Sequence, residues 1–429
     1  MKVAFVVHRY GAEIIGGAES LARQLADKLA TMTDTQVDVF TTCARNYQTW
    51  ENELPSGETL DGAVTVRRYA VDFPRCETFF NRISDSLFAH DSPPPSTELE
   101  LKWAKEQGPY SSLLMKSITE KKDDYDAFIF VTYLYATTLF ALPLVKEKSI
   151  LIPTAHDEVT IYLKLFDKLF AQAREILFLT EKEREFVESR FSRLKQGQIG
   201  SEKSSMILSV GVDGPDPQLL EQQLSEILHN ESSIQSPSLP TTQGISQAIK
   251  DLLKEKTAYL LYLGRIDKNK GCDHLYGCFA YFCWKYKTTR LKLIFAGTQH
   301  FFPDPHPNIQ ILGKVTEEEK WLLLKNAVTT VLPSQFESLS LSVLESFTVG
   351  TPVLVNRKCE VLQATIEKSG GGYSFLEAED FCDRLLELTR DPIESKKGLG
   401  EKGRTYVTTH YSWPSAVKTL TKTIERVSH

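Results

Sequence analysis

The chain has 429 residues, more than one hydrophobic core usually accommodates, so we expect two domains. Its 41% hydrophobic and 25% charged residues are typical of a globular protein and exclude disordered, fibrous and disulfide-scaffold classes. The formal net charge of -6 argues against a nucleic-acid-binding protein, which needs a basic face to neutralise phosphates.

The seven cysteines are an odd number and include no CxxC pair, which fits reduced thiols in a cytoplasmic protein. The apolar run KVAFVV at residues 2–7 is cut short by Arg9 and Tyr10, so it is too brief for a signal peptide. We interpret this run as a buried strand. We expect a cytoplasmic location and leave peripheral association at the inner membrane face open.

Short apolar runs alternate with amphipathic stretches, the pattern of βαβ units and parallel sheets. In the first half the predicted strands are residues 3–7, 37–42, 64–69, 127–131, 149–154 and 175–180. In the second half they are residues 258–264, 291–297, 309–313, 329–333 and 351–355. The sequence therefore predicts an α/β fold with two Rossmann-like, doubly wound parallel sheets.

A segment rich in Pro, Ser, Gln and Thr, residues 215–247, predicts a flexible connection or insertion near the domain boundary. We expect an N-terminal domain over residues 1–210, a linker over 211–255, a second domain over 256–410 and a final helix over 411–429. Two helix starts fit the capping-box pattern, Thr180 with Glu183 and Thr316 with Glu319.

Residues 127–145 are the remaining membrane-span candidate, uncharged but with three Thr, two Tyr and Pro143. A span needs about 20 predominantly apolar residues. We therefore favour a buried strand followed by a packed helix. Asp124 and Asp126 form a DxD before this strand, at the wrong end of the sheet for a site, and are interpreted as a cap at the strand entry.

Ligands of open parallel sheets bind beyond the carboxyl ends of the strands, so the residues after each strand matter most. After the first strand, Gly11, Gly16 and Gly17 precede an amphipathic helix that begins near Gly17. Free amides at a helix start suit an anion. The spacing is not GxGxxG, which disfavours an NAD-linked dehydrogenase, and a plain turn is the alternative interpretation.

After residues 258–264, the loop GRIDKNKG places Arg265 and Lys270 around one turn. Two cations so arranged can converge on one diphosphate, although loop cations are often only solvated surface charges. After residues 149–154 come His156 and Asp157. An imidazole at that edge can contact a reacting group or accept a proton, but a lone histidine is more often structural.

After residues 329–333, Glu337 lies in a loop and Glu345 about one and a half turns inside a helix that starts near Ser340. The amides of Ser338, Leu339 and Ser340 would then be donors at the positive helix end, suited to phosphate oxygens. The alternative for the two glutamates is a structural salt bridge.

These motifs, in this order, resemble the retaining type-B glycosyltransferases of family 4. The resemblance rests on GGAE (16–19), GRIDKNKG (264–271), FAG (295–297), Glu337 with Glu345 as an E-x7-E pair, SVGVD (209–213) and YSWPSAV (411–417). It implies the GT-B fold, with two Rossmann-like domains facing across a cleft and a C-terminal helix that crosses back to the first domain.

The resemblance also implies roles for residues that hold the donor, a nucleoside diphosphate sugar. Arg265 and Lys270 would bind its diphosphate and Glu345 the ribose hydroxyls. The backbone from Gly313 to Val315 would meet the base. UDP is the commonest donor nucleotide in the family, and GDP and ADP are the alternatives.

Around the transferred sugar, the resemblance implies that Glu337 binds hydroxyls and that His156 lies near the anomeric carbon. Gly17 would approach the donor phosphate or the acceptor. The chain departs from the family at Ser338 and Ser340, where glycines are usual, which leaves the donor's pose in question.

The implied reaction is retaining and metal-independent, because cations and helix amides stabilise the leaving diphosphate, and no cofactor is implied. A phosphorylase of the same fold and a non-catalytic partner subunit are the alternatives. The acceptor is open between a glycan, a lipid-linked and a small-molecule acceptor. Residues 72–125 look like a family-variable insertion, whose Phe73, Phe79, Phe80 and Phe88 would pack in a core rather than on a membrane.

Overall fold

A computed structural model describes residues 1–14, 16–89, 95–191, 206–229, 244–287 and 289–428. The chain divides into two compact units. The first unit comprises Met1–Val210 and Trp413–His429, and the second comprises Gly211–Ser412. The described part of residues 211–255, for which we predicted a linker, belongs to the second unit.

The described strands of the first unit form one sheet in the order β3-β4-β2-β1-β5-β6-β7-β8, parallel except for β3 against β4. The strands are β1 (Lys2–Val6), β2 (Gln36–Thr42), β3 (Gly57–Asp61), β4 (Val64–Tyr69), β5 (Ala127–Val131), β6 (Ser149–Ile152), β7 (Glu175–Phe178) and β8 (Met206–Ile207). All six predicted strands are confirmed. The prediction missed β3, an exposed edge strand with the polar sequence GETLD, and the two-residue β8.

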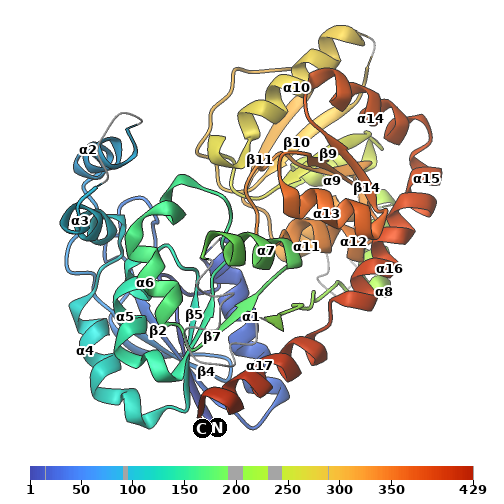
Figure 1. Ribbon diagram of the computed structural model, residues 1–429. Coiled ribbons are helices and arrows are strands. Elements are labelled where there is room, and N and C mark those ends of the chain that lie inside the picture. The colour runs from blue at the N-terminus through green and yellow to red at the C-terminus, as the bar shows by residue number, and fades with distance from the viewer. Residues whose placement is uncertain (15, 90–94, 192–205, 230–243, 288, 429) are drawn as a thin grey trace. The chain divides into compact units, whose positions relative to one another are not determined.

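Helices cover the sheet of the first unit (Figure 1). They are α1 (Gly17–Met32), α2 (Glu77–Phe88), α3 (Thr97–Gln107), α4 (Ser112–Lys121), α5 (Ala136–Ala141), α6 (Lys164–Gln172), α7 (Glu181–Arg190) and α17 (Trp413–Ser428). Burial on both faces explains why a strand such as β5, with all five residues buried, is apolar throughout. No helix among the described residues is long and apolar enough to span a membrane.

The segment over residues 72–125 contributes α2, α3 and α4, and three of the four phenylalanines that we expected to pack in a core do so. Phe79, Phe80 and Phe88 pack against the core that contains Trp103, and Phe73 stacks with Tyr110 at 6.3 Å between ring centroids. At the entry of β5, Asp126 Oδ2 accepts a hydrogen bond from Lys2 N (2.8 Å), which confirms its capping role.

The final helix, α17, packs on the first unit beside α1, which confirms the expected return of the chain (Figure 1). Arg426 Nη2 lies 3.1 Å from Glu175 Oε2 at the start of β7. Trp413 is buried, and the Lys28 ammonium of α1 lies 5.7 Å from its ring centroid.

The second unit contains a fully parallel sheet in the order β11-β10-β9-β12-β13-β14 within the described residues. The strands are β9 (Tyr259–Leu263), β10 (Lys292–Ala296), β11 (Ile309–Gly313), β12 (Thr329–Leu332), β13 (Val353–Asn356) and β14 (Gly372–Phe375). All five predicted strands are confirmed, and β14 was missed. The order is that of a doubly wound Rossmann sheet, whose switch point lies between β9 and β12.

The helices of the second unit are α8 (Pro217–His229), α9 (Gln247–Lys254), α10 (Cys272–Lys285), α11 (Glu317–Asn326), α12 (Leu341–Thr348), α13 (Glu360–Ser369), α14 (Ala378–Arg390), α15 (Pro392–Ser395) and α16 (Glu401–His410). The helix α8 occupies part of the segment over 215–247, in which we predicted a flexible connection or insertion, and its Leu220 and Ile227 are buried in the core. Residues 230–243 of that segment lie outside the described residues. Thr316 and Glu319 form the predicted capping box at α11.

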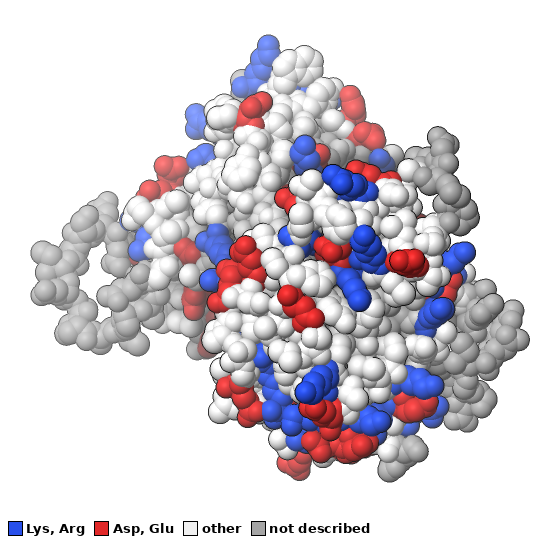
Figure 2. All heavy atoms as spheres, turned by 90° about the vertical axis from the view of Figure 1, so that its left-hand side faces the viewer, with Lys and Arg blue, Asp and Glu red and all other residues white. Residues whose placement is uncertain are grey.

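On the face shown in Figure 2, basic and acidic side chains are interspersed and form no broad area of one sign. This distribution agrees with the net charge of -6.

Candidate functional site

The candidate site of the second unit lies at the carboxyl ends of β9 and β12, the two strands that flank the switch point. Arg265 and Lys270 follow β9, and Glu337 follows β12. In doubly wound sheets the connections from the two strands at this point leave in opposite directions, and ligands bind there. The sequence thus brings two cations and a carboxylate to the ligand-binding position of the fold.

Asp267 organises the loop after β9. Its Oδ1 accepts a hydrogen bond from Lys270 N (2.8 Å), and its other carboxylate oxygen pairs with the Arg265 guanidinium. The Tyr262 hydroxyl donates to Arg265 O (2.6 Å). One buried carboxylate, which was not among the predicted site residues, therefore fixes both the turn and the arginine.

Lys270 and Glu337 form an ion pair, with Nζ 2.8 Å from Oε1. The Lys270 side chain is 33% exposed and that of Glu337 16%. Gly271 makes this approach possible, because it has a φ of 73° and a Cβ there would lie 2.4 Å from Pro333 O. The loops after β9 and β12 are in contact at a position that only glycine fits.

The helix α12 begins as predicted, with Ser340 as its N-cap. The Ser340 hydroxyl accepts a hydrogen bond from Val343 N (3.4 Å), so this side chain caps the helix at one of the two positions where the family has glycine. Ser338 and Ser340 are each 8% exposed. The Ser342 hydroxyl donates to Leu263 O (3.2 Å) and ties the first turn of α12 to the end of β9.

Glu345 points from α12 towards α11, where Lys320 Nζ lies 2.8 Å from its Oε1. Burial raises the pKa of Glu345, and the neighbouring Lys320 opposes that rise. Lys320 was not among the predicted site residues. Gly313, with a φ of 74°, and Val315 lie just before α11, so the predicted base-binding backbone leads directly into the helix that carries Lys320.

The FAG motif has a packing function. A Cβ on Gly297 would lie 1.8 Å from Gly264 O, and Gly297 N donates to Gly313 O (2.7 Å). The ends of β9, β10 and β11 therefore approach one another through bare backbone, which positions the loops that carry Arg265 and Val315.

Two predicted site residues, Gly17 and His156, belong to the first unit. Gly17 is the first residue of α1, as expected, and a Cβ there would meet nothing within 4 Å. His156 follows β6, with its side chain 27% exposed and Nδ1 3.8 Å from Glu158 Oε1. Both lie beyond the carboxyl ends of strands, in a different unit from Arg265 and Lys270.

A buried polar cluster at the switch point of the first sheet was not predicted as such. His8 Nε2 lies 2.9 Å from Glu19 Oε1, and the Arg9 guanidinium pairs with the same carboxylate. The His8 ring stacks on Tyr135, which follows β5, at 3.8 Å between centroids. Burial lowers the pKa of His8, and the neighbouring Glu19 carboxylate opposes that effect. Glu19 is the last residue of the GGAE motif, so this motif could have identified it as a candidate site residue.

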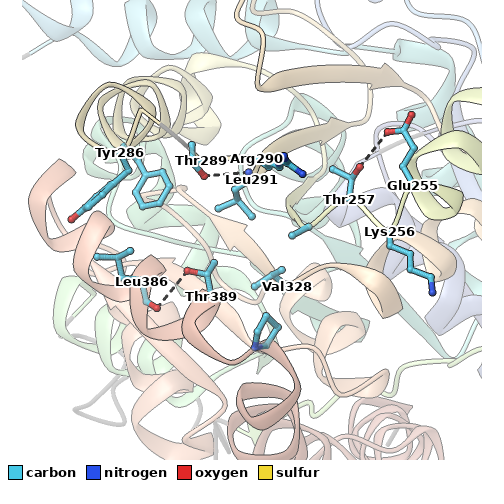
Figure 3. Close-up of a pocket in the computed structure, with 13 residues that line it drawn as sticks. Glu255, Lys256, Thr257, Tyr286, Thr289, Arg290, Leu291, Val328, Leu386 and Thr389 are labelled. Carbon is cyan, nitrogen blue, oxygen red and sulfur yellow. Dashed lines mark hydrogen bonds between the residues drawn. The ribbon is translucent and has the colours of Figure 1, made fainter.

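A pocket of about 620 Å³ lies elsewhere in the second unit (Figure 3). Its lining includes Ala258, Leu291 and Val328, which precede β9, β10 and β12. It is therefore at the amino ends of the strands, opposite the edge that carries Arg265 and Glu337.

Residues 245–406 match the family model described as glycosyl transferases group 1. This match covers most of the second unit, Gly211–Ser412. The second unit therefore resembles a glycosyl transferases group 1 domain over most of its length, and we refer to it as the group 1 domain. All the residues of the E-x7-E pair, the GRIDKNKG loop and the FAG motif lie inside this group 1 domain.

A curated relative is an alpha-1,3/1,6-mannosyltransferase of Dictyostelium discoideum, 25% identical over 113 residues. The alignment spans 26% of this chain and 27% of that relative, so it covers about a quarter of each.

Solved structures match over both units. Sucrose-phosphate synthase from Thermosynechococcus elongatus has a TM-score of 0.67 and 14% identity. This match covers 99% of the present chain and 98% of the synthase chain. Anabaena HepE, solved in complex with UDP and glucose, has a TM-score of 0.61 and 11% identity. This match covers 99% of the present chain and 100% of the HepE chain. These similarities confirm the GT-B fold, of which the group 1 domain is the second half.

Proposed function

We propose that the protein is a retaining, metal-independent glycosyltransferase that takes a sugar from a nucleoside diphosphate sugar. The observation that carries the proposal is the convergence of Arg265, Lys270 and Glu337 at the switch point of a group 1 domain. The first unit would bind the acceptor, which is a glycan, a lipid-linked or a small-molecule hydroxyl.

The chemistry follows from the charges. As the bond between the sugar and the diphosphate breaks, negative charge grows on the leaving group, and preorganised cations lower the barrier. Arg265 supplies a fork of N–H donors and Lys270 a point charge. Donor binding would exchange the Lys270–Glu337 pair for a Lys270–phosphate contact, so that Glu337 can accept hydrogen bonds from the sugar hydroxyls.

Retention would follow if the acceptor attacks the face that the diphosphate leaves, with a phosphate oxygen taking the acceptor proton. His156 would lie near the anomeric carbon and Gly17 near the phosphate or the acceptor. UDP is the first nucleotide to test, because a structural neighbour was solved with UDP and glucose.

A thermal-shift panel with UDP, GDP, ADP and their glucose and mannose conjugates, run in EDTA, tests the donor site. A nucleotide at a hundred times its Kd should stabilise the protein by about 2.7 kcal/mol. The shift should weaken in Glu345→Ala and persist in Lys268→Met, an exposed lysine of the same loop as Lys270. Absence of a shift with every nucleotide would overturn the proposal.

Turnover is tested with the conjugate that binds. Release of the free nucleoside diphosphate, in EDTA and with simple sugars as acceptors, is expected for the wild type and not for Arg265→Ala. NMR of the product then reports the anomeric configuration, and an inverted product would contradict the retaining mechanism.

A further inference from the structure

A buried ion pair joins α11 and α12 in the group 1 domain. Lys320 Nζ lies 2.8 Å from Glu345 Oε1 and 2.6 Å from Glu317 Oε2. The side chains of Lys320 and Glu345 are 13% and 15% exposed, whereas that of Glu317 is 75% exposed. The contact with Glu345 is therefore the desolvated one, and Glu317 lies at the solvent end.

The charge state of Glu345 depends on this lysine. Burial raises the pKa of Glu345, the Lys320 charge and hydrogen bond lower it, and Glu317 raises it again. Within the described residues, Lys320 and Glu317 of α11 are the charged groups that act on Glu345. Without Lys320, burial and Glu317 would both favour the protonated carboxyl.

A protonated carboxyl is a poorer partner for a diol than a carboxylate. An ionised Glu345 has two acceptor oxygens, of which Oε1 receives Lys320 and Oε2 can receive hydroxyl donors. Charge-assisted hydrogen bonds are roughly twice as strong as neutral ones. Protonation would both weaken the acceptor and place a competing O–H donor in the site.

We propose that Lys320 is a positioning residue of the nucleotide site, which keeps Glu345 ionised and oriented so that its second oxygen accepts the ribose hydroxyls of the donor. The inference rests on the proposed function, in which Glu345 binds the ribose of the donor. Lys320 acts at the ribose and, unlike Lys270, contributes nothing directly to the diphosphate.

The experiment compares the affinities of UDP and 2′,3′-dideoxy-UDP for the full-length protein between pH 6 and 9. Their ratio reports the ribose hydroxyls alone, because titration of the phosphates cancels. The wild type should prefer UDP roughly ten- to a hundredfold at every pH, the range of a hydrogen bond to a charged group. In Lys320→Met the preference should fall at pH 6 to the value of Glu345→Gln and recover towards pH 9.

Two further variants serve as controls. Lys320→Arg keeps the charge and should keep the preference. Lys325→Met, which changes a partly exposed lysine in the last turn of the same helix, should behave as the wild type. If Lys320→Met does not fold, Lys320→Gln takes its place with the same expected result.

The outcomes separate the two claims. Failure of the wild type to bind any nucleotide overturns the proposed function, and this inference with it. Normal UDP binding by Lys320→Met, with the wild-type preference at every pH, overturns the role of Lys320 alone and leaves a purely structural ion pair.

Discussion

Lys270 and Glu337 lie 67 positions apart in the sequence, yet Lys270 Nζ and Glu337 Oε1 are 2.8 Å apart in the fold. They follow β9 and β12, the neighbouring strands at which the sheet order reverses. The fold thus presents a cation and a carboxylate that can each be recruited by a different part of one ligand.

The first prediction concerns Lys270→Met. We expect its affinity for the nucleoside diphosphate that binds the wild type to fall about ten- to a hundredfold, because a charge-assisted contact is lost. Its free energy of unfolding should change by no more than about 1 kcal/mol, since a third of this side chain is in solvent. Isothermal titration and chemical denaturation measure the two effects.

Lys268→Met is the matched control for that prediction, because Lys268 is an exposed cation of the same turn. Equal losses of affinity in Lys268→Met and Lys270→Met would contradict a specific phosphate contact at Lys270.

The second prediction concerns the contact between β9 and β10. Gly297→Ala should destabilise the second unit by about 2–4 kcal/mol, because its φ is 144° and its Cβ would lie 1.8 Å from Gly264 O. Gly277→Ala, inside α10 with nothing near its Cβ, should instead stabilise by about 0.5–1 kcal/mol. Thermal unfolding of both variants measures the two changes in stability. A similar change in the two variants would contradict the prediction.

The parallel strands were predictable because burial on both faces makes them continuous apolar runs, as AFIFV of β5 shows. The edge strand β3 was not predictable, because its residues are exposed and its sequence contains no apolar run. The helix α8 was hidden because its Pro- and Ser-rich surroundings dominated the composition of residues 215–247.

The site residues divide in the same way. Arg265, Lys270 and Glu337 were predictable because they follow strands directly, where a parallel sheet binds its ligands. Lys320 was not, because its partner Glu345 lies 25 positions away on another helix and no local spacing encodes that packing.

The third prediction concerns Glu183, whose carboxylate accepts hydrogen bonds from Ala155 N (2.6 Å) and Leu179 N (2.7 Å). Burial nevertheless raises the pKa of Glu183 to about 8, from an ordinary value of 4.5. A group with a raised pKa in the folded state binds its proton more tightly there, so its contribution to stability falls as pH rises from about 4.5 to 8.

The loss should reach on the order of 3 kcal/mol by pH 7. Glu183→Gln lacks this titration. The unfolding free energy of the wild type minus that of Glu183→Gln should therefore decrease from pH 5 to pH 8, whereas the same difference for the exposed Glu185→Gln should stay flat. A wild-type advantage that grows with pH would show that Glu183 is ionised in the fold.

The fourth prediction concerns the buried cluster of the first unit. Glu19→Gln should destabilise that unit by about 3–5 kcal/mol, because it leaves the Arg9 charge buried without its carboxylate partner. Glu13→Gln, an exposed change in the loop that precedes α1, should have little effect. Urea denaturation followed by tryptophan fluorescence provides the measurement. A loss below about 1 kcal/mol for Glu19→Gln would mean that the pair is hydrated.

The packing of α17 on the first unit affects the order in which the protein can be completed during synthesis. Domains usually fold in the order in which they leave the ribosome. Here the second unit, Gly211–Ser412, is continuous and emerges whole, whereas the first unit still lacks the helix that buries Trp413, Leu420 and Ile424. The earlier-made unit is therefore finished last, and until then a nascent chain presents an unfilled apolar face beside α1 that a chaperone can recognise.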